Sequence, residues 1–215
     1  MQKPSRDLVL SVAVVIGLCG GHSVLAGAER ADTFPVMVVV HDRAQVFPGT
    51  LDRALKEAAR IYRQAGVAIE WLVDPAGASG SAATEGRPSL HAFTVQLIIQ
   101  AKLRVARDNT AKFVMGAAPK TTRECGGAVY VFNDEVTGFS NVHRMDAALV
   151  MGTVIAHEVG HVLLHREGHP AEGLMRASWD ANDWQRAAMG FLLFSSDDAV
   201  TIRATTSSCR QGGPD

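Results

Sequence analysis

The feature that most constrains the fold is an apolar helical run, DAALVMGTVIAHEVGHVLLH, at residues 146–165. Asp146 suits the N-cap of such a helix, and REGHP after the run ends it, because glycine and proline are poor interior residues. Aliphatic residues lie on both sides of HEVGH. Gly160 lies between its two histidines, where a helix would prefer alanine unless close packing needs the space. This context favours a metal site over two surface histidines.

The HEVGH segment places His157 and His161 one turn apart on the same face of the helix. Their Cα atoms are about 6 Å apart along the axis, which suits two imidazoles that grip one ion. HExxH on a helix is typical of zinc sites in which the glutamate is the general base. Zinc lowers the pKa of its bound water to about 7, and the carboxylate then takes the proton. We therefore predict His157 and His161 as Zn2+ ligands and Glu158 as the catalytic base.

A catalytic zinc takes a third protein ligand. His165 continues the series, but it lies about 12 Å along a straight helix from the first histidine and cannot reach the same ion. His169 follows Gly168, which can take a positive φ and reverse the chain. We favour His169 as the third ligand. Two carboxylates further along the chain remain alternatives, Asp180 and Asp183.

The first 26 residues have the pattern of an export signal. Lys3 and Arg6 precede the apolar run LVLSVAVVIGL, and small residues precede a cleavage point after Ala26. The run is shorter than the ~20 residues that a transmembrane helix needs, although an uncleaved anchor is the alternative. We expect an exported protein, periplasmic or extracellular, with no membrane span after signal removal.

Composition and cysteine count set further bounds. The formal net charge of -1 offers no basic field for nucleic acid, and 47% apolar residues allow a sizeable core. We expect one domain over residues 27–215. Export implies an oxidising compartment, so Cys125 and Cys209 are expected to form a disulfide, with two unpaired thiols as the alternative.

The remaining patterns predict an α+β fold. A helix over residues 48–66 separates two β-branched runs, which favours a right-handed crossover between parallel strands. Residues 101–120 are ambiguous, and residues 74–89 have the composition of a surface loop. The predicted strands cover residues 34–42, 67–73, 92–100 and 126–134, and the predicted C-terminal helices lie near 181–194 and 196–205.

The segments HEVGHVLLHREGH and GLM resemble the metzincin branch of zinc metallopeptidases. Metzincins show HExxHxxGxxH followed by a methionine turn beneath the metal. Here the third histidine comes two residues later, and Leu164 and Glu167 occupy the family's glycine and third-ligand positions. The resemblance implies a zincin fold with a small mixed sheet, a packed helix, an active-site helix, a Met-turn and C-terminal helices. It also implies that Met175 is the turn methionine, which supports the site without binding zinc.

The function that follows is hydrolysis of peptide bonds by an exported zinc metallopeptidase, with a peptide or protein as substrate. An extended peptide is expected along the strand GGAVYVF, which would be the edge strand of the sheet. A zinc-binding protein without turnover and an amide hydrolase acting on non-peptide or cell-wall substrates are the alternatives. The intact Glu158 favours an enzyme, since a purely structural site needs no free base.

Two further residues are candidates for stabilising an oxyanion, which needs a donor directed at the developing charge. These are Tyr130 and His143. More often a strand tyrosine is half-buried packing and a loop histidine is solvated. Substrate preference and oligomeric state are not encoded in any of these patterns.

Overall fold

The structure is a computed structural model that describes residues 35–74, 93–102, 114–166 and 168–211. The predicted export signal lies outside these residues, as do residues 75–89 of the predicted loop and Glu167. Export and signal cleavage therefore stay predictions.

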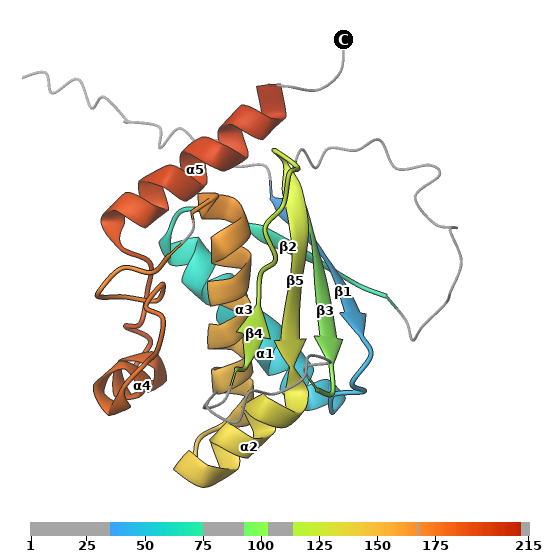
Figure 1. The fold of residues 1–215 in the computed structure, drawn as a ribbon, viewed down its shortest axis with the longest axis vertical. Helices are drawn as coiled ribbons and strands as arrows, with labels where there is room; N and C mark the ends of the chain where they lie inside the picture. The colour runs from blue at the N-terminus through green and yellow to red at the C-terminus, as the bar shows by residue number, and fades with distance from the viewer. Residues whose placement is uncertain (1–34, 75–92, 103–113, 167, 212–215) are drawn as a thin grey trace, which may run out of the picture. The chain divides into compact units, whose positions relative to one another are not determined.

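A five-stranded mixed sheet forms the centre of the described domain (Figure 1). Its spatial order is β2-β1-β3-β5-β4, and every neighbouring pair is parallel except β4 with β5. The antiparallel strand β4 is therefore one edge of the sheet. The strands are β1 (Val36–Asp42), β2 (Ile69–Val73), β3 (Thr94–Gln100), β4 (Gly116–Ala117) and β5 (Gly126–Phe132).

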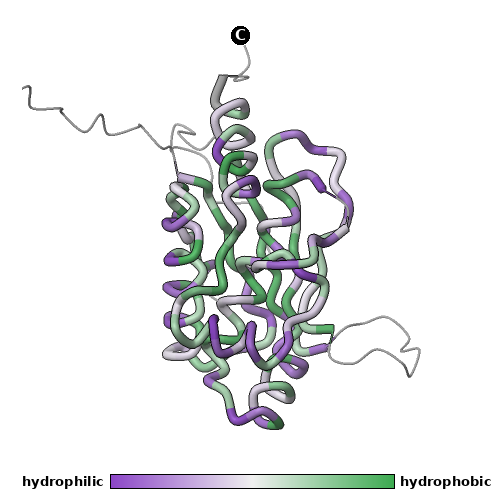
Figure 2. The backbone as a smooth tube through the Cα atoms, turned by 90° about the vertical axis from the view of Figure 1, so that its left-hand side faces the viewer, coloured by the Kyte–Doolittle hydropathy of each residue, from purple (hydrophilic) through white to green (hydrophobic). Residues whose placement is uncertain are grey.

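Five helices complete the described part of the chain: α1 (Pro48–Gln64), α2 (Asn133–His143), α3 (Ala147–Leu164), α4 (Ala181–Ala188) and α5 (Ser196–Gln211). Burial alternates along β1, where Val36, Val38 and Val40 are buried and the residues between them are half-exposed. The buried face packs with α1 and α3 into one hydrophobic core, and Figure 2 shows the apolar stretches of the tube that supply it. The fold class is α+β, as predicted.

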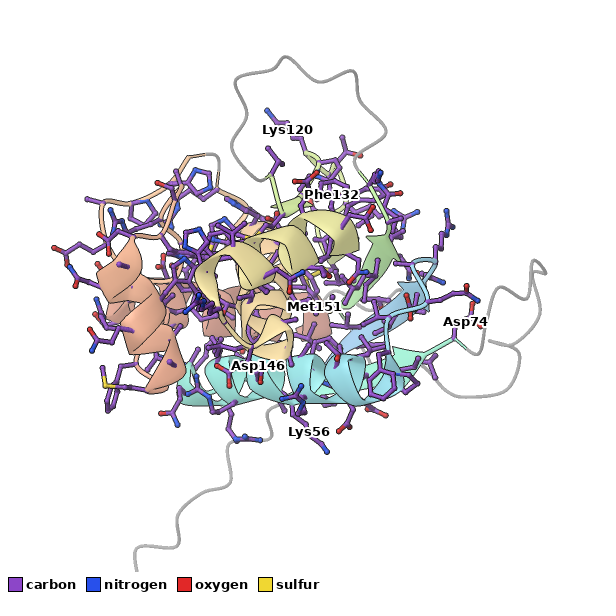
Figure 3. The ribbon with its side chains drawn as sticks, turned by 90° about the horizontal axis from the view of Figure 1, so that it is seen from below. Lys56, Asp74, Lys120, Phe132, Asp146 and Met151 are labelled. Atoms are coloured by element: carbon purple, nitrogen blue, oxygen red, sulfur yellow. A yellow bond between two sulfur atoms is a disulfide. The ribbon has the colours of Figure 1, made fainter. Side chains whose placement is uncertain are left out.

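The helix α3 runs through the hydrophobic core, and most of its residues are buried. It is long and apolar enough to cross a membrane, which the sequence analysis did not recognise, yet 83% of it is buried within the protein. Asp146, which is labelled in Figure 3, caps it by accepting a hydrogen bond from the Ala148 amide, and also pairs with Arg53 of α1 at 2.6 Å. A Cβ on Gly152 would lie 2.6 Å from the carbonyl oxygen of Ala54, so the glycine lets α1 and α3 pack closely. The N-terminal half of α3 is thus fixed against α1.

Most predicted elements are confirmed, including the parallel crossover from β1 through α1 to β2. Two elements were missed, the helix α2 and the two-residue strand β4. The predicted helix near 181–194 ends at Ala188, because Gly190 takes a φ of 81°. The expectation that GGAVYVF is the edge strand was wrong: β5 lies between β3 and β4, and β4 takes the edge.

The structure joins Cys125, directly before β5, to Cys209 in α5 by a disulfide across 84 positions of the sequence. This bond ties the C-terminal helix to the sheet. Cross-linking residues so far apart restricts the unfolded chain more than the folded one.

We expect the double variant Cys125→Ser, Cys209→Ser to lose about 2–4 kcal/mol of unfolding free energy, because the unfolded chain regains its freedom. Urea denaturation followed by circular dichroism measures the loss. Wild-type protein in a reducing agent is the matched control and should unfold at the midpoint of the double variant. An unchanged wild-type midpoint on reduction would contradict the expectation.

Candidate metal centre

Three histidine side chains meet at the C-terminal end of α3. The Nε2 atom of His161 lies 3.0 Å from Nε2 of His157 and 3.1 Å from Nε2 of His169. All three residues offer ligand atoms within 4.8 Å of one another, as a single metal ion requires. The first two come from successive turns of the helix, and the third comes from the segment after it. The three residues favoured on sequence grounds are therefore brought together.

The turn after α3 explains how His169 reaches the other two. The helix ends at His165, which adopts the left-handed conformation with a φ of 47°, and Gly168 has a φ of 88°. These two positions reverse the chain. Between them, Arg166 pairs at 3.0 Å with the buried carboxylate of Asp198 in α5. His165 itself is exposed and lies outside the cluster. The ion pair anchors the segment between His161 and His169, which is two residues longer here than in the HExxHxxGxxH pattern.

The donor set fits a zinc ion. The Leu174 carbonyl accepts a hydrogen bond from Nδ1 of His157 at 2.9 Å, so the proton of this imidazole is on Nδ1 and its Nε2 carries a lone pair. That lone pair faces Nε2 of His161, which also lies close to Nε2 of His169, and such an arrangement repels unless a cation or a proton lies between the nitrogens. Three imidazoles and an open fourth position are a frequent set for catalytic zinc.

The electrostatics of the cluster also suit metal binding. The pKa of His157 is lowered from 6.5 to about 4, mainly by burial; the hydrogen bond to the Leu174 carbonyl opposes this shift, and the two neighbouring histidines add to it. Burial is also the largest cause of the lowered pKa values of His161 and His169. All three rings are therefore neutral near pH 7, which is the form that binds a metal.

Glu158 lies next to this cluster and is buried, with a relative exposure of 7%. Burial raises the pKa of its carboxyl from 4.5 to about 8. The edge strand β4 passes directly over it: a Cβ on Gly116 would lie 2.5 Å from Oε1 of Glu158. A side chain at position 116 would displace the carboxylate, so Gly116 sets where Glu158 rests.

Met175 directly follows Leu174, whose carbonyl accepts the His157 hydrogen bond, and is almost fully buried. A Cβ on Gly160 would lie 2.8 Å from its sulfur, so the glycine between the two helix histidines leaves space for this methionine. The Leu174 amide donates to the Leu193 carbonyl at 2.9 Å, which fixes the turn that carries both residues. The position suits the supporting role expected of Met175.

A cavity of about 1390 Å³ opens over the histidines and Glu158. Residues 114–121, which include β4, line one side of it. Three aromatic side chains also line it: Phe139 of α2, Trp184 of α4 and Trp179 of the segment before α4. The cluster therefore faces an open cleft rather than a closed core, as a site that admits a substrate must.

Other predicted site residues lie elsewhere. Asp180 and Asp183, the alternative ligands, both pair with Arg176 and form the capping box of α4. Neither belongs to the histidine cluster. His143 lines the cleft, whereas Tyr130 does not. Only His143 is placed to meet a substrate there.

The structure adds three site features that sequence reasoning missed: the Leu174 carbonyl, Gly116 and Asp198. The first is a backbone group, and the other two come from elements distant in sequence from the histidines. The GLM segment was the only signal near any of them, since it marked the turn that contains Leu174.

No family model matches the chain, and no curated protein matches it. A solved structure of a zinc-dependent peptidase from Methanocorpusculum labreanum (strain Z) matches with a TM-score of 0.50 and 14% sequence identity. The match covers 77% of this chain and 99% of that chain. At this identity the likeness concerns the fold alone. The chain therefore has the α+β fold of a zinc peptidase, and its histidine cluster is compatible with zinc.

We expect His169→Ala to weaken zinc affinity by at least ~100-fold, because it removes a ligand, and substitutions of residues that only hydrogen-bond to a ligand already cost 10–100-fold. Competition with a chromophoric chelator measures the affinity. His165→Ala is the matched control, since this histidine is four residues away and outside the cluster. Equal affinities for the two variants would point to another third ligand.

We expect Glu158→Gln to stabilise the metal-free protein, and by more at pH 8 than at pH 5. The folded state keeps a proton on Glu158 up to about pH 8, whereas the unfolded state releases it near pH 4.5. Wild-type stability therefore loses up to about 1.4 kcal/mol per pH unit in this window, and the amide has no such proton.

Melting temperatures in a chelating buffer at pH 5, 6.5 and 8 test this expectation. The histidines titrate in both proteins, so their contributions cancel in the difference. Glu172→Gln, on an exposed side chain, is the control, and its difference in melting temperature from wild type should not grow between pH 5 and pH 8. A difference between Glu158→Gln and wild type that stays constant with pH would contradict the prediction.

Proposed function

We propose that the chain is an exported zinc-dependent metallopeptidase of the metzincin-like kind. The observation that carries the proposal is the convergence of three imidazole nitrogens beside a buried carboxylate, at the floor of an open cleft. The fold shared with a zinc-dependent peptidase supports it. The export-signal pattern of residues 1–26 supports the exported location.

His157, His161 and His169 would hold the ion. When bound, zinc supplies a Lewis acid that polarises a carbonyl and makes water more acidic. The charge of a bound ion would also favour the ionised form of Glu158, because an opposite charge lowers the pKa that burial has raised. Glu158 is then a carboxylate able to accept a proton.

Glu158 acts as general base and then as general acid. It takes a proton from water in the cleft as the water oxygen bonds to the carbonyl carbon of the substrate. The carbon–nitrogen bond breaks, and the proton passes from Glu158 to the leaving amine. Gly116 keeps the carboxylate in place, because its missing side chain leaves the space that Glu158 occupies.

The substrate most suited to the cleft is an extended peptide. The antiparallel strand β4 is an edge of the sheet, and its residues line the cavity next to Glu158. An edge strand offers unpaired backbone groups to an extended chain, which gives affinity along the backbone. We therefore propose β4, in place of β5, as the strand that binds the substrate.

We expect zinc-loaded Glu158→Gln to lose at least ~100-fold in kcat/KM while its zinc affinity stays within a few-fold of wild type, since the side chain is not a ligand. A library of internally quenched peptides provides the substrate, and its turnover gives the rate. Glu172→Gln is the control and should keep full activity.

Two results would overturn the proposal. Full activity in Glu158→Gln would exclude this residue as the base. Zinc binding without turnover of any peptide would favour the alternatives, a zinc-binding protein without turnover or an amide hydrolase with non-peptide substrates.

A further inference from the structure

A single backbone carbonyl accepts two side-chain hydrogen bonds at the metal centre. The Leu174 oxygen lies 2.9 Å from Nδ1 of His157 and 3.1 Å from Nε1 of Trp179. The indole ring also meets the imidazole edge to face, with ring centroids 5.2 Å apart and an interplanar angle of 87°. Trp179 therefore contacts His157 directly and shares its hydrogen-bond acceptor.

The carbonyl is where the orientation of His157 is set. An imidazole ligand is fixed in tautomer and rotation by the group that accepts its other N–H. Here that acceptor belongs to an irregular turn, without a helix or strand to fix the peptide plane. The Trp179 N–H donates to the second lone pair of the oxygen. This bond holds the peptide plane of Leu174 in the orientation in which the oxygen also accepts from His157.

Trp179 is itself held in place by further aromatic packing. Its ring meets Trp184 of α4 with centroids 5.1 Å apart, and Trp184 meets Phe139 of α2 at the same separation. The stack thus runs from α2 through α4 to His157. An indole held this way loses little freedom when it bonds the carbonyl.

We infer that Trp179 is a positioning residue for the metal ligand His157, acting through the Leu174 carbonyl. The inference rests on the proposed metal site for its effect on zinc. The hydrogen-bond arrangement itself is a property of the metal-free chain. Residues of this kind typically change metal affinity 10–100-fold when they are substituted.

Trp179→Phe removes the N–H and keeps an aromatic ring. We expect about a 10-fold loss of zinc affinity, a changed visible spectrum of the cobalt-substituted protein, and a shifted or broadened Nδ1–H proton resonance of His157. The resonance is recorded in the metal-free protein. The expected result therefore has one readout that needs no metal.

Trp184→Phe is the matched control, because it keeps an aromatic ring against Trp179 and leaves the Trp179 hydrogen bond to Leu174 intact. It should lose comparable stability yet keep zinc affinity within about 2-fold of wild type and leave the His157 resonance in place. Wild-type affinity and an unmoved resonance in Trp179→Phe would overturn the inference. An equal loss of affinity in both variants would overturn it too, since general packing would then be the cause.

A protein that binds no zinc in any form would defeat the proposed function instead. The His157 resonance in the metal-free variants would still decide whether Trp179 orients the ring. The two failures are therefore distinguishable.

Discussion

The structure depends on burying polar side chains in its central helix. α3 packs against α1 and the sheet along most of its length, yet His157 and Glu158 lie within it and are almost as buried as its aliphatic residues. A buried polar group is costly unless it has a partner. His157 has such a partner, because its N–H donates to the Leu174 carbonyl. Glu158 has space instead, because Gly116 of β4 carries no side chain where the carboxylate lies. The cleft thus has its floor inside the hydrophobic core, which accounts for the strong effects of burial on the titration of its residues.

The C-terminal third of the chain is organised around keeping that floor in shape. α5 is joined to the start of β5 by the disulfide, and its Asp198 holds Arg166 in the turn between the second and third histidines. The turn with Leu174 and Met175 is bound to the Leu193 carbonyl just ahead of the same helix. Three separate connections therefore link α5 and the segment before it to the surroundings of the site. A longer spacer between ligands is tolerable under these conditions, because the entropy that it adds is removed by anchoring its middle.

The sequence was informative wherever the signal was local. β-branched runs predicted β1, β2, β3 and β5, and the helix at 147–164 with its Asp146 cap followed from its own residues. Helix geometry alone separated His165 from the cluster. α2 was missed because NDEVTGFSNVH is polar and without a clear period, and β4 was missed because two small residues carry no strand pattern. The order of strands is set by packing across the whole sheet, so β5 was wrongly placed at its edge.

The same distinction explains which parts of the site escaped prediction. The proposed ligands and the proposed base are side chains with characteristic spacing, so HEVGH and the histidine after Gly168 were enough to predict them. The groups that we propose to orient them are a backbone oxygen at Leu174, an absent side chain at Gly116 and a tryptophan ten residues beyond His169. None of these has a chemical identity specific to metal binding, and each gains its role only from what lies within a few ångströms in the folded chain. Since orientation of a ligand depends on such groups, a motif fixes the chemistry available to a site, whereas the fold around it fixes how well that chemistry is positioned.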